Sequence, residues 1–267
     1  MRKPLIVGNW KMNTTLSDAV VLTTQIRNAI EDLEVDIVLC PPFVWLVPLN
    51  DLLEHAPDNL SLGAQNMWFT DKGAITGEIS PLMLKNLVKY VILGHSERRF
   101  HFGESNALIN DKVHAALQHG ITPILCISEL KKIQNEKRGR GRPTFTELRS
   151  NILQQLKMGL KGIGENDITK IIIVFEPVWA ISTTADTKGA ASGIYAASVI
   201  NRLKSYLEEK YGRECAADVT MLYGGSVDAS NVAEFLYQPE IDGVLVGSAS
   251  LKASEFIKIC KIAGGPD

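Results

Sequence analysis

Short apolar runs alternate with amphipathic stretches from one end of the chain to the other. The runs are rich in Val, Ile and Leu, which is typical of strands that are buried on both faces of a parallel sheet. The predicted strands are Leu5–Val7, Asp36–Cys40, Leu60–Ala64, Tyr90–Leu93, Thr122–Cys126, Lys170–Glu176, Val219–Tyr223 and Gly243–Val246.

Between the strands, apolar side chains recur every three or four residues, which predicts helices with one buried face. The marker residues are Leu108, Val113, Ala116 and Leu117, then Leu148, Ile152, Leu156 and Leu160, then Val199, Ile200, Leu203 and Leu207. Thr144 and Glu147, just after Pro143, have the spacing of a capping box that would begin the second of these helices.

Strands and helices in this order, within 267 residues, predict a closed (β/α)8 barrel of the α/β class, with residues 1–267 forming a single domain. The competing fold is an open, doubly wound sheet. Its dinucleotide-binding version is disfavoured because no Gly-x-Gly-x-x-Gly motif follows the first strand.

Charge and cysteine usage narrow the functional class. The net charge of −2 offers no general attraction for nucleic acid or an anionic membrane, so we expect neither as a partner. No apolar run approaches the roughly 20 residues of a membrane helix, and the apolar stretch near the N-terminus is too short for a signal peptide. The cysteines lack CxxC spacing, which argues against a zinc site or a disulfide framework and predicts a cytoplasmic protein.

One segment departs from the average composition. Lys131–Pro143 follows the fifth predicted strand and is rich in Lys, Arg and Gly. A binding site for a polyanion or a partner is one interpretation, but a solvated surface insertion is favoured because no aromatic residues are interleaved. We therefore expect that shortening this segment leaves kcat/KM, measured on the purified variant, within a few fold of wild type.

The most distinctive polar residue is Glu176, which ends the apolar run that follows Lys170. Glu176 directly precedes Pro177, which cannot continue a central strand, so we expect the strand to end near Glu176. Barrels place their chemistry at the carboxyl ends of their strands. A partly desolvated carboxylate there suits a general base, whereas the simpler alternative is a strand-end glutamate that turns to solvent.

Two further strand ends carry candidate groups. Asn9 and Lys11 follow the first strand, where Lys11 could bind a phosphate or polarise an oxygen, although strand-end lysines are more often solvated. His95 follows the fourth strand and could donate a hydrogen bond to a substrate oxygen. A helix beginning near Ser96 would keep the imidazole neutral; the alternative is a structural histidine.

Glycine-containing turns follow the last two strands. Gly224 and Gly225 precede Ser226, and Gly247 precedes Ser248. Glycine lets the backbone approach an oxyanion closely, and free N–H groups in such turns form anion sites. Since barrels often bind phosphate after strands seven and eight, the two turns together indicate a phosphate site.

Read in chain order, these motifs resemble the triosephosphate isomerase family. The main matching segments are Gly8–Asn13, Gly94–Arg99, Glu176–Ile181 and Tyr223–Val227, supported by Ala64–Asn66, Gly73–Glu78, Phe102–Glu104 and Asp242–Gly247. The resemblance extends from Pro4 to about Leu251.

The resemblance implies a TIM barrel that interconverts dihydroxyacetone phosphate and glyceraldehyde 3-phosphate, a step of glycolysis and gluconeogenesis. It implies that Glu176 is the base, that neutral His95 polarises the carbonyl, and that Lys11 stabilises the negative charge. The other implied site residues are Asn9, which steadies Lys11 and the substrate; Ser182, Ser226, Gly247 and Ser248, which bind the phosphate; and Ser96 and Glu97, which support the base and Lys11. It also implies a homodimer, with the loop Gly73–Glu78 reaching the partner, and no metal or organic cofactor.

Three departures from the family pattern concern the phosphate site and the lid. The lid segment from Ser182 to Lys188 lacks the usual glycines, Ser248 replaces a glycine, and Ser128 replaces another after the fifth strand. We expect the Ser182 backbone N–H still to contact the phosphate. The alternative function is a weakly active or non-catalytic homologue that binds another phosphorylated ligand; the intact set of Glu176, His95 and Lys11 argues against it.

Overall fold

Eight parallel strands form a closed barrel in the computed structural model, which describes residues 2–129, 152–180 and 191–265. The strands pair in chain order, and β1 closes the barrel by pairing with β8. The strands are β1 (Leu5–Asn9), β2 (Asp36–Cys40), β3 (Leu60–Ala64), β4 (Tyr90–Leu93), β5 (Thr122–Glu129), β6 (Ile172–Pro177), β7 (Thr220–Tyr223) and β8 (Gly243–Val246). The predicted (β/α)8 fold is thus confirmed.

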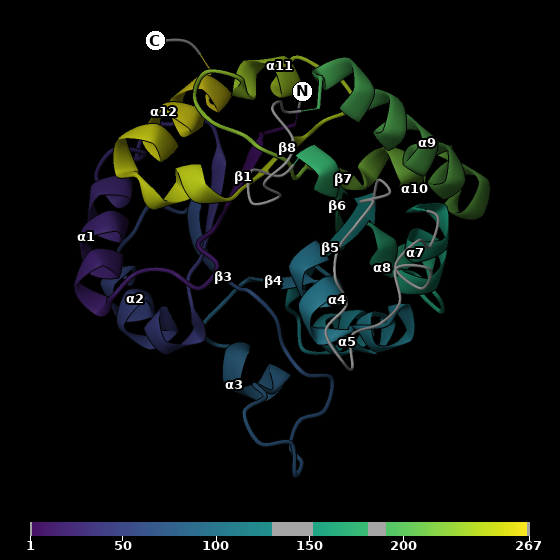
Figure 1. Ribbon diagram of the computed structural model, residues 1–267, viewed down its shortest axis with the longest axis horizontal. Helices are drawn as coiled ribbons and strands as arrows, with labels where there is room; N and C mark the ends of the chain where they lie inside the picture. The colour runs from purple at the N-terminus through teal and green to yellow at the C-terminus, as the bar shows by residue number, and fades with distance from the viewer. Residues whose placement is uncertain (1, 130–151, 181–190, 266–267) are drawn as a thin grey trace, which may run out of the picture.

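Helices surround the strands (Figure 1). They are α1 (Leu16–Arg27), α2 (Leu46–Leu52), α3 (Pro81–Leu84), α4 (Ser96–Phe102), α5 (Asn106–Gln118), α7 (Ile152–Gly159), α8 (Glu165–Ile168), α9 (Gly193–Tyr211), α10 (Arg213–Asp218), α11 (Val232–Leu236) and α12 (Ala253–Ala263), with 3-10 turns η1 (Phe43–Trp45), η2 (Val178–Ala180) and η3 (Ser248–Leu251). In the described part of the chain, no helix has the length and apolar character needed to span a membrane.

Several strand boundaries differ from the prediction, since β1 continues to Asn9 and β7 begins at Thr220. β5 continues to Glu129, and β6 includes Pro177, because the two strands stay paired as far as Glu129 opposite Pro177. Proline lacks an N–H but can still occupy the last position of a strand. β6 also begins at Ile172 and not at Lys170. Leu148, the capping box and the segment Lys131–Pro143 lie outside the described residues.

The alternation of side chains along each strand separates two buried layers. Leu5 and Val7 of β1 point into the barrel, whereas Ile6 packs against the surrounding helices. On β6, Ile172 and Val174 point inward in the same way. Since alternate residues of a strand share a face, the same alternation directs the next residues of these series, such as Asn9, into the barrel at its carboxyl end.

Candidate active site

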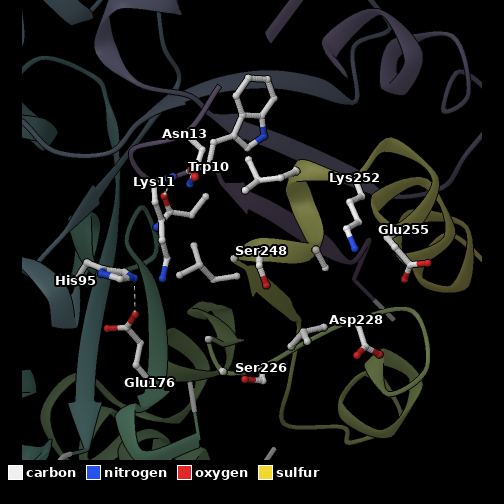
Figure 2. A pocket seen from close by; sticks show the side chains of 18 residues that line it. Trp10, Lys11, Asn13, His95, Glu176, Ser226, Asp228, Ser248, Lys252 and Glu255 are labelled. Carbon is white, nitrogen blue, oxygen red and sulfur yellow. Dashed lines mark hydrogen bonds and ion pairs between the residues drawn. The ribbon is translucent and has the colours of Figure 1, made fainter. Parts of the chain in front are cut away.

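A cavity of about 520 Å³ opens at the carboxyl ends of the strands. Among the described residues, those at and after the ends of β1, β4, β6, β7 and β8 supply its lining. Predicted site residues among the lining are Asn9, Lys11, His95, Glu176, Ser226, Gly247 and Ser248. Figure 2 shows His95, Lys11 and Glu176 facing the same space.

Glu176 is fully buried, unlike the solvent-facing alternative considered from the sequence. Its Oε2 accepts a hydrogen bond of 2.9 Å from the Ser96 N–H and one of 3.0 Å from the Ser128 hydroxyl. Its Oε1 lies 3.0 Å from His95 Nε2 but has no well-formed hydrogen bond. Gly224 leaves room for this side chain, since a Cβ there would lie 3.2 Å from Glu176 Cγ and 2.6 Å from Val174 Cγ1. One carboxylate oxygen is therefore anchored and the other is available.

His95 is the N-cap of α4, as expected for a helix that begins at Ser96. The Glu97 N–H donates to its Nδ1 at 3.2 Å, so Nδ1 acts as an acceptor. The Glu97 carboxylate is farther away, with Oε2 3.7 Å from Nδ1. An imidazole whose Nδ1 accepts a hydrogen bond is neutral and carries its proton on Nε2. This Nε2 is the nitrogen that faces Glu176 (Figure 2).

Lys11 has a left-handed backbone, with φ of 54°. Residues other than glycine rarely adopt this conformation, so its neighbours must hold it. Its N–H donates to Asn9 Oδ1 at 3.0 Å, and Gln65 Nε2 donates to its carbonyl oxygen at 2.8 Å. These two contacts fix the direction in which the ammonium enters the cavity.

The ammonium of Lys11 is paired within the site. Its Nζ lies 2.6 Å from Glu97 Oε1. Burial favours the neutral form of Glu97, but the hydrogen bond from Lys11 and the positive charge of Lys11 outweigh this effect and lower the pKa of Glu97. Glu97 thus stays ionised at neutral pH and holds Lys11 beside His95.

Arg99 braces the backbone behind the site. Its guanidinium is buried and donates to the carbonyl oxygens of Gly94, at 2.6 Å, and Cys126, at 3.0 Å. Burial lowers the pKa of Arg99 to about 10, which still leaves the group charged at neutral pH. Arg99 therefore ties the end of β4, next to His95, to β5.

The predicted phosphate side of the cavity lies around Ser226 and Ser248 (Figure 2). The Ser226 hydroxyl donates to the Ala180 carbonyl oxygen at 2.8 Å, and its N–H does so at 3.3 Å. Gly247 faces Lys11, because a Cβ at Gly247 would lie 3.7 Å from Lys11 Cε. Ser182 and the rest of the segment to Lys188 lie outside the described residues.

Several residues near the site were not singled out as site residues from the sequence. Glu129 accepts hydrogen bonds from Trp179 Nε1, at 2.9 Å, and from the Tyr195 hydroxyl, at 2.6 Å. These bonds join the end of β5 to η2, which follows Glu176, and to α9. Gln65 and Ser128 also contact site residues. For Ser128, the alternation along β5 was a usable signal, since Ile124 and Cys126 point into the barrel.

No group of three or more His, Cys, Asp and Glu side chains suited to a metal ion occurs among the described residues. All four cysteines are free, and Cys40, Cys126 and Cys260 are buried. Burial raises the pKa of the Cys126 thiol well above its ordinary value, and nearby Glu176 adds to this effect. Cys126 is therefore a packing residue beside the site and an unreactive thiol at neutral pH.

Comparison with known proteins covers nearly the whole chain. A family model described as triosephosphate isomerase matches residues 4–263. A protein named triosephosphate isomerase from Thermoanaerobacter pseudethanolicus is 44% identical over 262 residues, which are 97% of this chain and 99% of the relative. Proteins of the same name from Dehalococcoides mccartyi and Clostridium tetani are 45% identical over 264 residues and 40% identical over 260 residues, with at least 96% of each chain covered.

Proposed function

The chain belongs to the triosephosphate isomerase family and is an isomerase of triose phosphates, and on this premise we propose that Glu176, His95 and Lys11 carry out the reaction. The reaction interconverts dihydroxyacetone phosphate and D-glyceraldehyde 3-phosphate, a step of glycolysis. The observation that carries the residue assignment is the fully buried Glu176, whose available Oε1 faces the cavity 3.0 Å from His95 Nε2.

In the proposed mechanism, Glu176 removes a proton from the carbon beside the carbonyl of the substrate. The electron pair of that C–H bond forms a carbon–carbon double bond, and the carbonyl oxygen gains negative charge. The Nε2–H of His95 donates a hydrogen bond to this oxygen, and Lys11 stabilises its charge. Glu176 then returns the proton to the neighbouring carbon, and proton transfer between the two oxygens completes the isomerisation. This sequence needs no oxidant and no cofactor.

The phosphate group is proposed to bind on the side of Ser226, Gly247 and Ser248, as the glycine-containing turns predicted. The Ser226 hydroxyl and N–H both donate to the Ala180 carbonyl oxygen. Binding through the Ser226 N–H would therefore exchange this contact for one to phosphate. Ser182 remains a predicted phosphate ligand.

The function is tested by coupling the reaction to a dehydrogenase that consumes one of the two triose phosphates. We expect the purified protein to isomerise the substrate in both directions without added metal, and EDTA to leave kcat/KM unchanged. A protein that binds a triose phosphate analogue but shows no turnover would instead support the non-catalytic alternative. No observation on the described residues favours that alternative.

We also propose that the protein is a homodimer. Large apolar side chains are exposed on segments that follow β1 to β4, which are neighbours in the barrel. They are Met12, Val44, Ile75, Leu82, Met83 and Phe102, with Met12 95% exposed. Figure 1 shows the connection between β3 and α3 protruding beyond the outline of the barrel. A protruding loop beside exposed apolar side chains indicates a surface that a second copy covers.

Light scattering tests the dimer. We expect twice the mass of one chain at micromolar concentration, and we expect Met83→Glu to shift the protein toward monomer, because a buried charge opposes association. Tyr237→Glu is the control: Tyr237 is 82% exposed but follows α11, away from the segments after β1 to β4. A monomeric wild type, or equal effects of the two substitutions, would contradict the proposed interface.

A cytoplasmic location is likewise a proposal. It is supported by the glycolytic reaction of the family and by the four free cysteines, which suit a reducing compartment. Fractionation of the source cells would test it directly.

A further inference from the structure

A lysine that the proposed mechanism does not use lies on the outer wall of the cavity. Lys252 lines the cavity together with Ser226, Gly247 and Ser248, the residues proposed to bind the phosphate. It is exposed to solvent, and Figure 2 shows its ammonium on the same side of the cavity as Ser226 and Ser248. A positive charge is thus available beside the proposed phosphate site.

The backbone of Lys252 is fixed where η3 ends and α12 begins. Its N–H donates to the Ala249 carbonyl oxygen at 3.3 Å, and its own carbonyl oxygen accepts from the N–H groups of Glu255, at 3.0 Å, and Phe256, at 2.9 Å. The side chain therefore starts from a fixed point, while its flexible stem lets the ammonium follow an anion. The N-terminus of α12 adds partial positive charge at the base of this side chain.

The other lysine among the described lining residues is already paired. Lys11 Nζ lies 2.6 Å from Glu97 Oε1, so the Glu97 carboxylate balances much of its charge. In the part of the chain that the structure describes, no carboxylate forms an ion pair with Lys252. Of the two lysines, Lys252 thus presents the charge that no direct ion pair compensates.

Two carboxylates on the same wall oppose the binding of an anion. Asp228 and Glu255 also line the cavity, and each repels a phosphate when it is ionised. The Ser230 hydroxyl and N–H both donate to Asp228 Oδ1, and these bonds lower the pKa of Asp228, so that it is ionised at neutral pH. Without Lys252, the described charges of this wall would all be negative.

We propose that Lys252 is a further substrate-binding residue, whose ammonium attracts the phosphate group of the triose phosphate to the side of Ser226 and Ser248. This inference rests on the proposed function and its phosphate site. A phosphate monoester carries a charge of about −1.5 to −2 at pH 7, so the lysine offsets the repulsion from Asp228 and Glu255. Because Lys252 acts on the phosphate and not on the carbon that loses its proton, it sets affinity and the association rate more than the chemical step.

The test is Lys252→Met, which removes the charge and keeps a long side chain. At low ionic strength we expect KM to rise by about threefold to tenfold, with kcat within about twofold, and the inhibition constant of inorganic phosphate to rise by a similar factor. At about 0.5 M NaCl the difference from wild type should shrink below about twofold, because salt screens exposed charges. Lys252→Arg keeps the charge and should retain the wild-type KM within about twofold.

Lys258→Met is the matched control. Lys258 is also an exposed lysine next to this wall, on α12, but it does not line the cavity. Its replacement changes the net charge equally and leaves the described cavity wall intact, so we expect unchanged KM and unchanged phosphate inhibition. Equal effects of the two Lys→Met substitutions, an unchanged KM in Lys252→Met, or a lower kcat with unchanged KM would contradict the role of Lys252.

Calorimetric titration with inorganic phosphate separates this inference from the proposed function, because it measures binding without turnover. We expect the wild type to bind phosphate and Lys252→Met to bind it about threefold to tenfold more weakly. That result in a protein without isomerase activity would overturn the proposed reaction and still support Lys252 as an anion-binding residue. Conversely, an active enzyme that binds phosphate equally well with and without the Lys252 ammonium, or a wild type that binds no phosphate, would overturn the role of Lys252.

Discussion

Replacing Glu176 by Gln is expected to lower kcat by about 10³-fold, since general-base catalysis typically contributes between about 10² and 10⁴. The amide has nearly the same shape as the carboxylate but cannot accept the substrate proton. KM should change far less, because phosphate binding is assigned to the other side of the cavity. The measurement is the coupled assay on protein from a host that lacks its own isomerase.

Glu176→Asp provides a graded comparison. It keeps the carboxylate but withdraws it by one methylene, and a displacement of ~1 Å can reduce the rate by ~10². Both variants should unfold near the wild-type temperature if the fold is intact. Retention of wild-type kcat by either variant would exclude Glu176 as the base.

Replacing Glu104 by Gln is expected to reduce the free energy of unfolding by about 3 kcal/mol or more, because removal of one partner leaves a buried charge without compensation. The Lys112 side chain is fully buried, and its Nζ lies 2.6 Å from Glu104 Oε1 and 2.9 Å from Asn66 Oδ1. Burial lowers the pKa of Lys112, and the charge of Glu104 opposes this effect. Arg98 also donates to Glu104 Oε1, at 2.6 Å.

Chemical denaturation at a fixed protein concentration measures this effect, since the stability of the proposed dimer would depend on concentration. The double variant Glu104→Gln/Lys112→Met should recover part of the loss, because it leaves no lysine charge in the interior. The exposed pair Lys170 and Asp167 is the control: Asp167→Asn should cost less than about 1 kcal/mol. Equal losses for Glu104→Gln and Asp167→Asn would contradict the argument from burial.

The strand pattern and its alternation predicted much of the site. Asn9 continues the inward series of Leu5 and Val7, and Glu176 continues that of Ile172 and Val174. Side chains that point inward at the carboxyl end of a barrel converge, so these positions could be inferred from local sequence. His95 and Lys11 were candidates because they follow the fourth and first strands, and the family motifs added their roles.

Other features could not be inferred from local sequence. A lysine is rarely buried without a partner. Lys112 lies on the face of α5 that also buries Ile109 and Val113. Only the tertiary structure shows that Glu104 and Asn66 surround its ammonium. Similarly, the alternation along β5 directs Ser128 into the barrel, but local sequence does not identify its partner. Its contact with Glu176 became apparent from the pairing of β5 with β6.

The sequence by itself determined the barrel, the inward or outward direction of each strand residue, and the set of groups at the strand ends, because these depend on hydrophobic periodicity and short motifs. The tertiary structure alone decided which groups meet. His95 and Glu176 come from β4 and β6, which are not adjacent, yet barrel closure and the brace of Arg99 bring Nε2 and Oε1 to 3.0 Å. Distances between groups far apart in the chain depend on packing of the whole barrel, which no local pattern encodes.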